Sequence, residues 1–218
     1  MSTGQIWAIV VAAGRGVRFG SAKQFEPLGS TSVVERSIAT ARRHVDGVVV
    51  VVPANGPAEL TGADVVVAGG STRAGSVRHG LAAVPSAATA VLVHDAARPL
   101  AADAIYERVN DALRRGADAV VPVIPLADTI RRTSGEPADR ESFVQVQTPQ
   151  GFSREALTEA HAAGNEATDD ATLAEQAGFV VEFVDGEARN FKVTDPDDLR
   201  VAEALIADDA LRVGEGPR

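Results

Sequence analysis

The stretch 11–23 contains the residue types that can hold a polyphosphate. It follows an apolar run that predicts a buried strand, and its glycines let a large ligand come close to the backbone. Arg15, Arg18 and Lys23 then supply positive charge. Because a strand, a small-residue loop and fixed cations together suit phosphate binding, we expect an anionic ligand at this loop.

The glycine spacing in this loop argues against two familiar nucleotide-binding motifs. The glycines stand at positions 14, 16 and 20, which is one residue too wide for the dinucleotide fingerprint G-x-G-x-x-G. Lys23 is not preceded by glycine, as the lysine of a P-loop would be. A glycine-rich turn between a strand and a helix, with solvated cations, is the structural alternative.

A second glycine-rich loop, 69–76, follows the third expected strand. Its first two glycines permit close approach of the backbone, and Ser71 or Thr72 can cap the helix that follows. Exposed N–H groups here could read the edge of a base. Helix capping alone would explain the same residues, so both interpretations stay open.

A charged pair, Asp95 and Arg98, stands just past the next apolar strand. A carboxylate beside bound phosphates can hold Mg²⁺ or a ribose hydroxyl, and an arginine can bind a phosphate through two nitrogens. A salt bridge between the two side chains that braces the loop is the alternative. We interpret His94 as structural, because no nucleophile in the sequence pairs with it.

Two later segments carry side chains of the same kind. Lys192 is flanked by apolar residues in a short strand-like piece, which would aim its charge inward. A lysine that protects an edge strand from aggregation is the alternative there. The run 168–170, Thr-Asp-Asp, predicts a helix cap, with a contact to a substrate hydroxyl as the second interpretation.

The elements that must position these residues alternate between strand and helix. Short, β-branched apolar segments predict strands at 6–11, 48–52, 65–68, 90–93, 119–123 and 180–184. Helices are expected at 32–43, 73–83, 102–115, 154–163, 169–177 and 196–207. Alternation of this kind predicts one α/β domain over 1–210, with a mostly parallel sheet and ligands beyond the carboxyl ends of its strands.

Residues 128–147 break the alternation and read as two strands around a Ser-Gly-Glu-Pro turn. We therefore expect a protruding β-hairpin arm at about 127–147, with a surface loop as the alternative. An isolated hairpin is barely stable in water, which predicts that the arm packs on a partner subunit. The last helix should begin at a Thr194 or Asp195 cap, and the tail 211–218 should be disordered.

The composition and net charge of the chain limit the functions that it can have. The chain has 218 residues and a formal net charge of -9, which disfavours binding to nucleic acid. It has no cysteine, so disulfides and thiolate metal sites are excluded. Neither a signal peptide nor an apolar run of membrane-spanning length is evident, so we expect a cytoplasmic protein that does not associate with membranes.

Taken in series, these motifs closely resemble one family, the 2-C-methyl-D-erythritol 4-phosphate cytidylyltransferases. The resemblance is carried, in chain order, by Ala12-Ala-Gly-x-Gly-x-Arg18, Lys23-Gln24, Gly69-Gly-Ser-x-Arg73 with Ser76, His94-Asp-Ala-Ala-Arg-Pro99, Asp128-Thr129, Thr148-Pro-Gln150, Thr168-Asp169 and Lys192-Val-Thr194. It implies a three-layer, Rossmann-like fold of the nucleotide-diphospho-sugar transferase type. It also implies transfer of CMP from CTP to 2-C-methyl-D-erythritol 4-phosphate with Mg²⁺ and release of pyrophosphate, a step of non-mevalonate isoprenoid biosynthesis.

The same resemblance implies roles for single residues. Arg18 and Lys23 would hold the triphosphate and neutralise the leaving pyrophosphate, and Lys192 would face the α-phosphate. The nucleotide would contact Ala12, Ala13, Gly14, Gly70, Ser71, Ser76, Asp95 and Ala96. Asp95 would also lie near the metal ion. The sugar phosphate would contact Arg98, Thr129, Arg140, Thr168 and Lys192.

In the family, residues of the arm reach a neighbouring subunit, which implies a homodimer through the arm. A cytidylyltransferase that acts on ribitol 5-phosphate would share the nucleotide loops and is the nearest rival hypothesis. A nucleotide-binding module without turnover is a further alternative, although binding alone would not need Arg18 and Lys23 at the leaving group.

Overall fold

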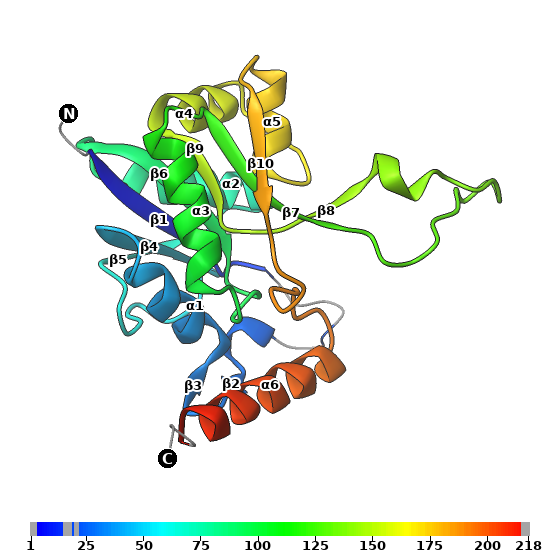
Figure 1. Cartoon of the computed structure of the whole chain (residues 1–218). Coiled ribbons are helices and arrows are strands. Elements are labelled where there is room, and N and C mark those ends of the chain that lie inside the picture. Colours follow the sequence, from blue (N-terminus) through cyan, green and yellow to red (C-terminus); the bar gives the residue numbers. More distant parts are fainter. Residues whose placement is uncertain (1–3, 15–18, 20–21, 215–218) are drawn as a thin grey trace.

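The structure is a computed structural model that describes residues 4–14, 19 and 22–214. These residues form one α/β unit on an eight-stranded sheet (Figure 1). The sheet order is β10-β7-β9-β6-β1-β4-β5, and β8 pairs with the outer part of β7. Its strands are β1 (Gln5–Val11), β4 (Gly47–Val52), β5 (Val65–Ala68), β6 (Ala88–Asp95), β7 (Ala119–Pro125), β8 (Val144–Val146), β9 (Gln150–Ser153) and β10 (Val181–Asp185).

Side chains of the central strands alternate between two hydrophobic clusters, one on each face of the sheet. Val10 and Val50 pack with α1 and α3, whereas Ile9 and Val49 pack with α2, α4 and α5. β4 is buried along its whole length, as expected of an inner strand covered on both faces. The helices are α1 (Val33–Arg42), α2 (Arg73–Ala83), α3 (Asp103–Arg114), α4 (Arg154–Ala162), α5 (Asp170–Gln176) and α6 (Pro196–Gly214), with short 3-10 turns η1 (Lys23–Phe25) and η2 (Arg140–Ser142).

The strand directions confirm the predicted three-layer, mostly parallel fold. β1 runs parallel to β4 and β6, β4 to β5, and β7 to β10. Each strand expected from the sequence is present, with ends that differ by no more than two residues. The parallel order brings the carboxyl ends of β1, β5 and β6 to the same edge, where the glycine-rich loops and Asp95 lie.

β9 is a strand that the sequence pattern does not predict. It runs antiparallel between β6 and β7, and its sequence Gln-Gly-Phe-Ser lacks β-branched residues. Gly151 is needed there because a Cβ would collide with Val109 and Leu113 of α3. Close packing of a helix on this strand has therefore replaced the usual apolar pattern. The sequence pattern also does not predict a small hairpin, β2 (Pro27–Leu28) with β3 (Thr31–Ser32), in which Ser32 ends β3 and caps α1.

The last helix is longer than expected. Asp195 caps it, because its carboxylate accepts hydrogen bonds from the backbone N–H groups of Asp197 and Asp198 at 3.0 and 3.1 Å. The helix continues to Gly214, so the prediction of a disordered tail is wrong for residues 211–214; residues 215–218 lie outside the described part. Two ion pairs involve the extra turns, Arg189 with Asp209 at 2.7 Å and Arg212 with Asp208 at 2.9 Å.

The arm projects away from the sheet, as predicted (Figure 1). Its regular ladder is shorter than expected, because only the base of the arm is paired, where β8 runs antiparallel to the end of β7. Farther out, a single bridge joins Arg131 to Pro137 around the turn at Gly135. The side chains of this outer part are mostly exposed and polar, so no apolar face is available to extend the ladder.

Candidate active site

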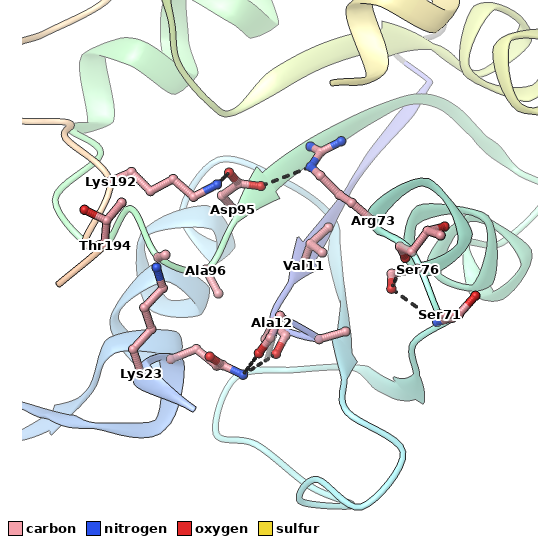
Figure 2. Close-up of a pocket in the computed structure, with 16 residues that line it drawn as sticks. Val11, Ala12, Lys23, Ser71, Arg73, Ser76, Asp95, Ala96, Lys192 and Thr194 are labelled. Carbon is pink, nitrogen blue, oxygen red and sulfur yellow. Dashed lines mark hydrogen bonds and ion pairs between the residues drawn. The ribbon is translucent and has the colours of Figure 1, made fainter. Parts of the chain in front are cut away.

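A cavity of about 380 Å³ lies at the edge of the sheet where β1 and β6 end. Its walls are the loop after β1, the loop between β5 and α2, the end of β6 and the segment before α6 (Figure 2). This is where an open parallel sheet binds its ligands. Of the residues predicted from the sequence, the following line it: Ala12, Ala13, Gly14, Lys23, Gly70, Ser71, Ser76, Asp95, Ala96 and Lys192.

The side chain of Gln24 holds the loop after β1 in place. Gln24 is buried, and its side-chain amide donates hydrogen bonds to the carbonyls of Ala12 at 2.7 Å and Gly14 at 3.0 Å. The backbone N–H of Ala12 donates to the carbonyl of Val51 at 2.7 Å. This anchoring presents the loop backbone to the cavity, with Lys23 extending into it (Figure 2). Arg15 and Arg18 lie outside the described residues.

The loop between β5 and α2 lies directly against the first loop. A Cβ at Gly69 would come within 2.5 Å of the Ala13 Cβ, so only glycine lets the two loops touch. Thr72 caps α2 by accepting from the Gly75 N–H at 2.9 Å, which confirms one of the two predicted caps. The Ser76 hydroxyl accepts from the Gly70 N–H at 3.2 Å and donates to the Thr72 carbonyl at 2.9 Å. Ser76 therefore shapes the loop from within.

A row of alternating charges crosses the cavity (Figure 2). Lys192 Nζ lies 2.6 Å from one carboxylate oxygen of Asp95, and Arg73 Nε lies 3.5 Å from the other. Arg73 also pairs with the buried Asp170 at 2.8 Å. Burial alone would raise the pKa of the Asp95 carboxyl, but the charges of Lys192 and Arg73 outweigh burial and hold this pKa well below its usual range. Asp95 is therefore a carboxylate at neutral pH.

His94 is structural, as the sequence suggested. The ring is fully buried, and burial lowers its pKa to about 4, so it is neutral at pH 7. Its Nε2–H donates to the Arg98 carbonyl at 3.2 Å, which leaves Nδ1 to accept from the Thr148 hydroxyl at 3.2 Å. That hydroxyl in turn accepts from the backbone N–H of Asp95 at 3.0 Å. The chain of hydrogen bonds fixes the backbone that carries Asp95.

Arg98 does not line the cavity. Its guanidinium is largely buried and donates to the carbonyls of Asn190 at 2.6 Å and Val146 at 3.1 Å. The ion pairs that Asp95 makes are with Lys192 and Arg73, so the alternative of a bracing Asp95–Arg98 salt bridge is not what the geometry shows. Arg98 ties β8 to the segment that carries Lys192, and the expected phosphate contact stays a prediction.

Like Arg98, three further predicted residues lie away from the cavity of their own chain. Thr129 and Arg140 are exposed on the arm, where Arg140 donates to the Ala127 carbonyl at 2.9 Å. Thr168 is exposed beside Asp169, which caps α5 by accepting from the Thr172 N–H at 3.1 Å. The capping interpretation is therefore correct for Asp169. Contacts of Thr129, Arg140 and Thr168 with a substrate stay predictions.

The cavity also contains residues for which the sequence suggested no part in ligand binding. Arg73 and Thr194 line it, as does the Gln24 anchor described above. Arg73 offered a signal, because a cation in the first turn of a helix is disfavoured by the helix dipole unless carboxylates compensate it. In the structure, Asp95 and Asp170 provide that compensation.

The lining residues that the structure describes supply one carboxylate for a divalent cation, that of Asp95. Among the described residues, no cluster of three or more His, Asp or Glu side chains could bind a metal ion. Mg²⁺ commonly binds through one or two carboxylates together with substrate phosphates and water. The residues therefore fit Mg²⁺ that arrives on a polyphosphate, rather than a site formed by the protein alone.

Among the helices that the structure describes, none has the length and hydrophobicity of a membrane-spanning segment.

Comparisons with known proteins point to one family. The sequence profile of 2-C-methyl-D-erythritol 4-phosphate cytidylyltransferase matches residues 6–208. Proteins of that name from Streptomyces coelicolor and Nocardia farcinica are 43% and 45% identical to the chain; the matches cover 95% and 93% of it, and 87% and 94% of the relatives. The crystal structure of the enzyme from Thermus thermophilus superposes with a TM-score of 0.82 at 40% identity, covering 94% of this chain and 100% of that one.

Proposed function

The chain belongs to the 2-C-methyl-D-erythritol 4-phosphate cytidylyltransferase family, and we propose that the cavity beside Asp95 is its active site. The enzyme is a nucleotidyltransferase of non-mevalonate isoprenoid biosynthesis. It transfers CMP from CTP to 2-C-methyl-D-erythritol 4-phosphate, giving 4-diphosphocytidyl-2-C-methyl-D-erythritol and pyrophosphate. One observation carries the placement: cations from different walls surround a cavity formed by the loops that the family motifs identify.

The chemistry is a direct displacement at phosphorus. A phosphate oxygen of the sugar phosphate attacks the α-phosphorus of CTP, and the bond from that phosphorus to the oxygen bridging the β-phosphate breaks. The electron pair leaves with pyrophosphate. Such a reaction needs positioned cations rather than a protein nucleophile. The neutral, hydrogen-bonded state of His94 supports this reading, because the ring has no free proton acceptor to activate a nucleophile.

Each cation of the cavity would contact a different phosphate group, according to the segment that carries it. Lys23 projects from the loop after β1 and would neutralise the leaving pyrophosphate, together with Arg18. Lys192 enters from the segment before α6 and would stabilise charge on the α-phosphate in the transition state. Mg²⁺ carried by the triphosphate would add further charge neutralisation, with Asp95 as the protein carboxylate able to hold it.

The nucleotide would lie against the two glycine-rich loops. Gly14 and Gly70 line the cavity, and Gly69 lets the second loop touch the first. The loop that contains Ser71 would receive the base through backbone groups. The hydroxyl of Ser76 is committed to the loop itself, where it accepts from the Gly70 N–H, so we propose that Ser76 shapes the loop rather than contacts the base.

We propose a homodimer in which the arm completes the neighbouring site. Arg140 and Thr129 project on an arm that leaves the body of its own chain (Figure 1). The base of the arm exposes Phe143, Val144 and Val146, which are large apolar side chains suited to a subunit interface. The cytoplasmic location expected from the sequence stays a prediction.

The test is pyrophosphate release by the purified enzyme with each pairing of CTP, UTP or ATP with 2-C-methyl-D-erythritol 4-phosphate or ribitol 5-phosphate. We expect release to require CTP, the methylerythritol phosphate and Mg²⁺. A higher kcat/KM with ribitol 5-phosphate would overturn the substrate assignment. Tight CTP binding without pyrophosphate release from any pairing would instead favour a nucleotide-binding module.

A further inference from the structure

The row of charges in the cavity ends in a buried pair that the proposed reaction does not use. We propose that Asp170, supported by His161, is a positioning residue that fixes Arg73 as a second counter-ion of Asp95. Held in this way, Arg73 stays with the carboxylate when Lys192 leaves it for the anionic substrate. The proposal rests on the proposed function, because it assigns Lys192 to the substrate phosphate.

The pair has the geometry of a fixed anchor. Asp170 is completely buried, and its two carboxylate oxygens accept from Arg73 Nη1 at 2.8 Å and from His161 Nε2 at 3.0 Å. His161 is itself buried on α4. With both oxygens engaged from different sides, the carboxylate cannot turn, and neither can the guanidinium that it holds.

Arg73 reaches across from this anchor to Asp95. Its Nε lies 3.5 Å from Asp95 Oδ1, which is an ion pair that is not closed to hydrogen-bond distance. A planar guanidinium holds its donors in a fixed fork that can engage two carboxylates in one geometry, whereas a lysine ammonium is a point charge on a flexible stem. Arg98 also lies near Asp95, but its terminal nitrogens donate to backbone carbonyls. Arg73 is therefore the cation placed to remain with Asp95.

Lys192 is the partner that can move. Its side chain is 40% exposed, against 25% for Arg73, and its contact with Asp95 is a single one at 2.6 Å. The lysine stem is flexible and its charge is a point charge. Since the Asp95 carboxylate is 13% exposed, removal of Lys192 would leave a nearly buried charge uncompensated whenever Mg²⁺ is not held there, unless another side-chain cation stays. Without Arg73, Asp95 would compete with the substrate for Lys192.

A purely structural tether is the alternative, and the chain offers a matched control for it. Arg78, one turn farther along α2, pairs with Glu166 at 2.8 Å and so ties α2 to the segment between α4 and α5. This tether joins the same region of the fold as Arg73–Asp170 but does not line the cavity. If Arg73 only held the elements together, loss of Arg78 and loss of Arg73 would act alike.

The experiment is a double-mutant cycle read in kcat/KM for the sugar phosphate. In the otherwise intact enzyme we expect Arg73→Met to lower kcat/KM about 30-fold and Asp170→Asn about 10-fold. In the Lys192→Met background we expect each to cost less than about 3-fold, because the competition for Lys192 no longer exists. Arg78→Met should change kcat/KM by less than about 2-fold. Arg73→Lys should not restore activity, since it lacks the fork.

Each outcome decides a different point. Equal losses with and without Lys192 would overturn the proposal and leave Arg73 as a tether. An Arg73→Lys variant with full activity would overturn it too. A Lys192→Met enzyme that keeps normal kcat/KM would instead contradict the proposed function, because Lys192 would have no role in turnover. If Arg73→Met does not fold, Asp170→Asn, which keeps the shape of the side chain, carries the same cycle.

Discussion

Gln24 offers a measurable link between folding and nucleotide binding. The Gln24→Leu substitution keeps the volume of the side chain but removes the two hydrogen bonds to the carbonyls of Ala12 and Gly14. Each bond contributes about 0.5–1.5 kcal/mol net, and leaving the buried Ala12 carbonyl without its donor adds about 1–3 kcal/mol. We expect a loss of about 2–6 kcal/mol in the free energy of unfolding. For a chain of this size that lowers Tm on the order of 10 °C.

The same substitution should weaken the nucleotide site. Because Gln24 fixes the loop that carries Lys23, we expect KM for CTP to rise about tenfold with kcat changed little, the pattern of lost ground-state binding. Thermal unfolding followed by circular dichroism and steady-state pyrophosphate release measure the two effects. Asn110→Leu is the control: it also removes a buried amide, which donates to the His44 carbonyl at 2.9 Å near the start of β4, far from the cavity. It should lower Tm and leave KM unchanged.

One result would refute this reasoning. If Gln24→Leu lowered Tm as Asn110→Leu does but bound CTP as the unaltered enzyme does, the loop would not depend on its anchor. The loop would then be either preformed without Gln24 or not in contact with the nucleotide.

Two further predictions concern the arm and His94. If the arm completes the neighbouring site, mixing inactive Arg140→Ala and Lys192→Ala chains should restore about a quarter of the activity. Random pairing makes half of the dimers heterodimers, and each heterodimer has one intact site. No recovery of activity in the mixture would contradict a site shared between subunits. For His94, burial lowers the pKa to about 4 in the folded state, so the unfolded chain takes up this proton below about 6.5 and the folded chain does not. Stability should therefore fall by about 3 kcal/mol as pH drops from 6.5 to 4, and His94→Gln should flatten this decline in chemical denaturation. An unchanged slope would show that His94 does not titrate in that window.

The sequence contains enough information for the core of the fold. β-branched apolar segments such as 48–52 become inner strands because both faces are covered, and their short runs mark them clearly. The rule that ligands bind beyond the carboxyl ends of parallel strands then places Lys23, Asp95 and the loop 69–76 near one another. Capping by Thr72 and Asp195 follows from side chains that satisfy the first N–H groups of a helix.

The sequence pattern could not predict contacts between distant segments. Arg73 and Asp170 are 97 residues apart, and nothing in the spacing of either motif points to the other. Arg98 was expected to face a phosphate, yet its guanidinium donates to two backbone carbonyls, a choice that depends on the three-dimensional course of β8. The sequence pattern does not predict β9, because Gly151 is required by the close packing of α3 on this strand and not by strand propensity.

The most direct test of the central claim compares turnover with binding in one variant, Lys23→Met. Lys23 would face the pyrophosphate that leaves, so its charge matters more in the transition state than in the bound CTP. Pyrophosphate release should fall at least about 100-fold in kcat, while the Kd for CTP measured by calorimetry should rise less than about tenfold. Equal losses in kcat and in CTP affinity would contradict the claim that this cavity stabilises the transition state of cytidylyl transfer.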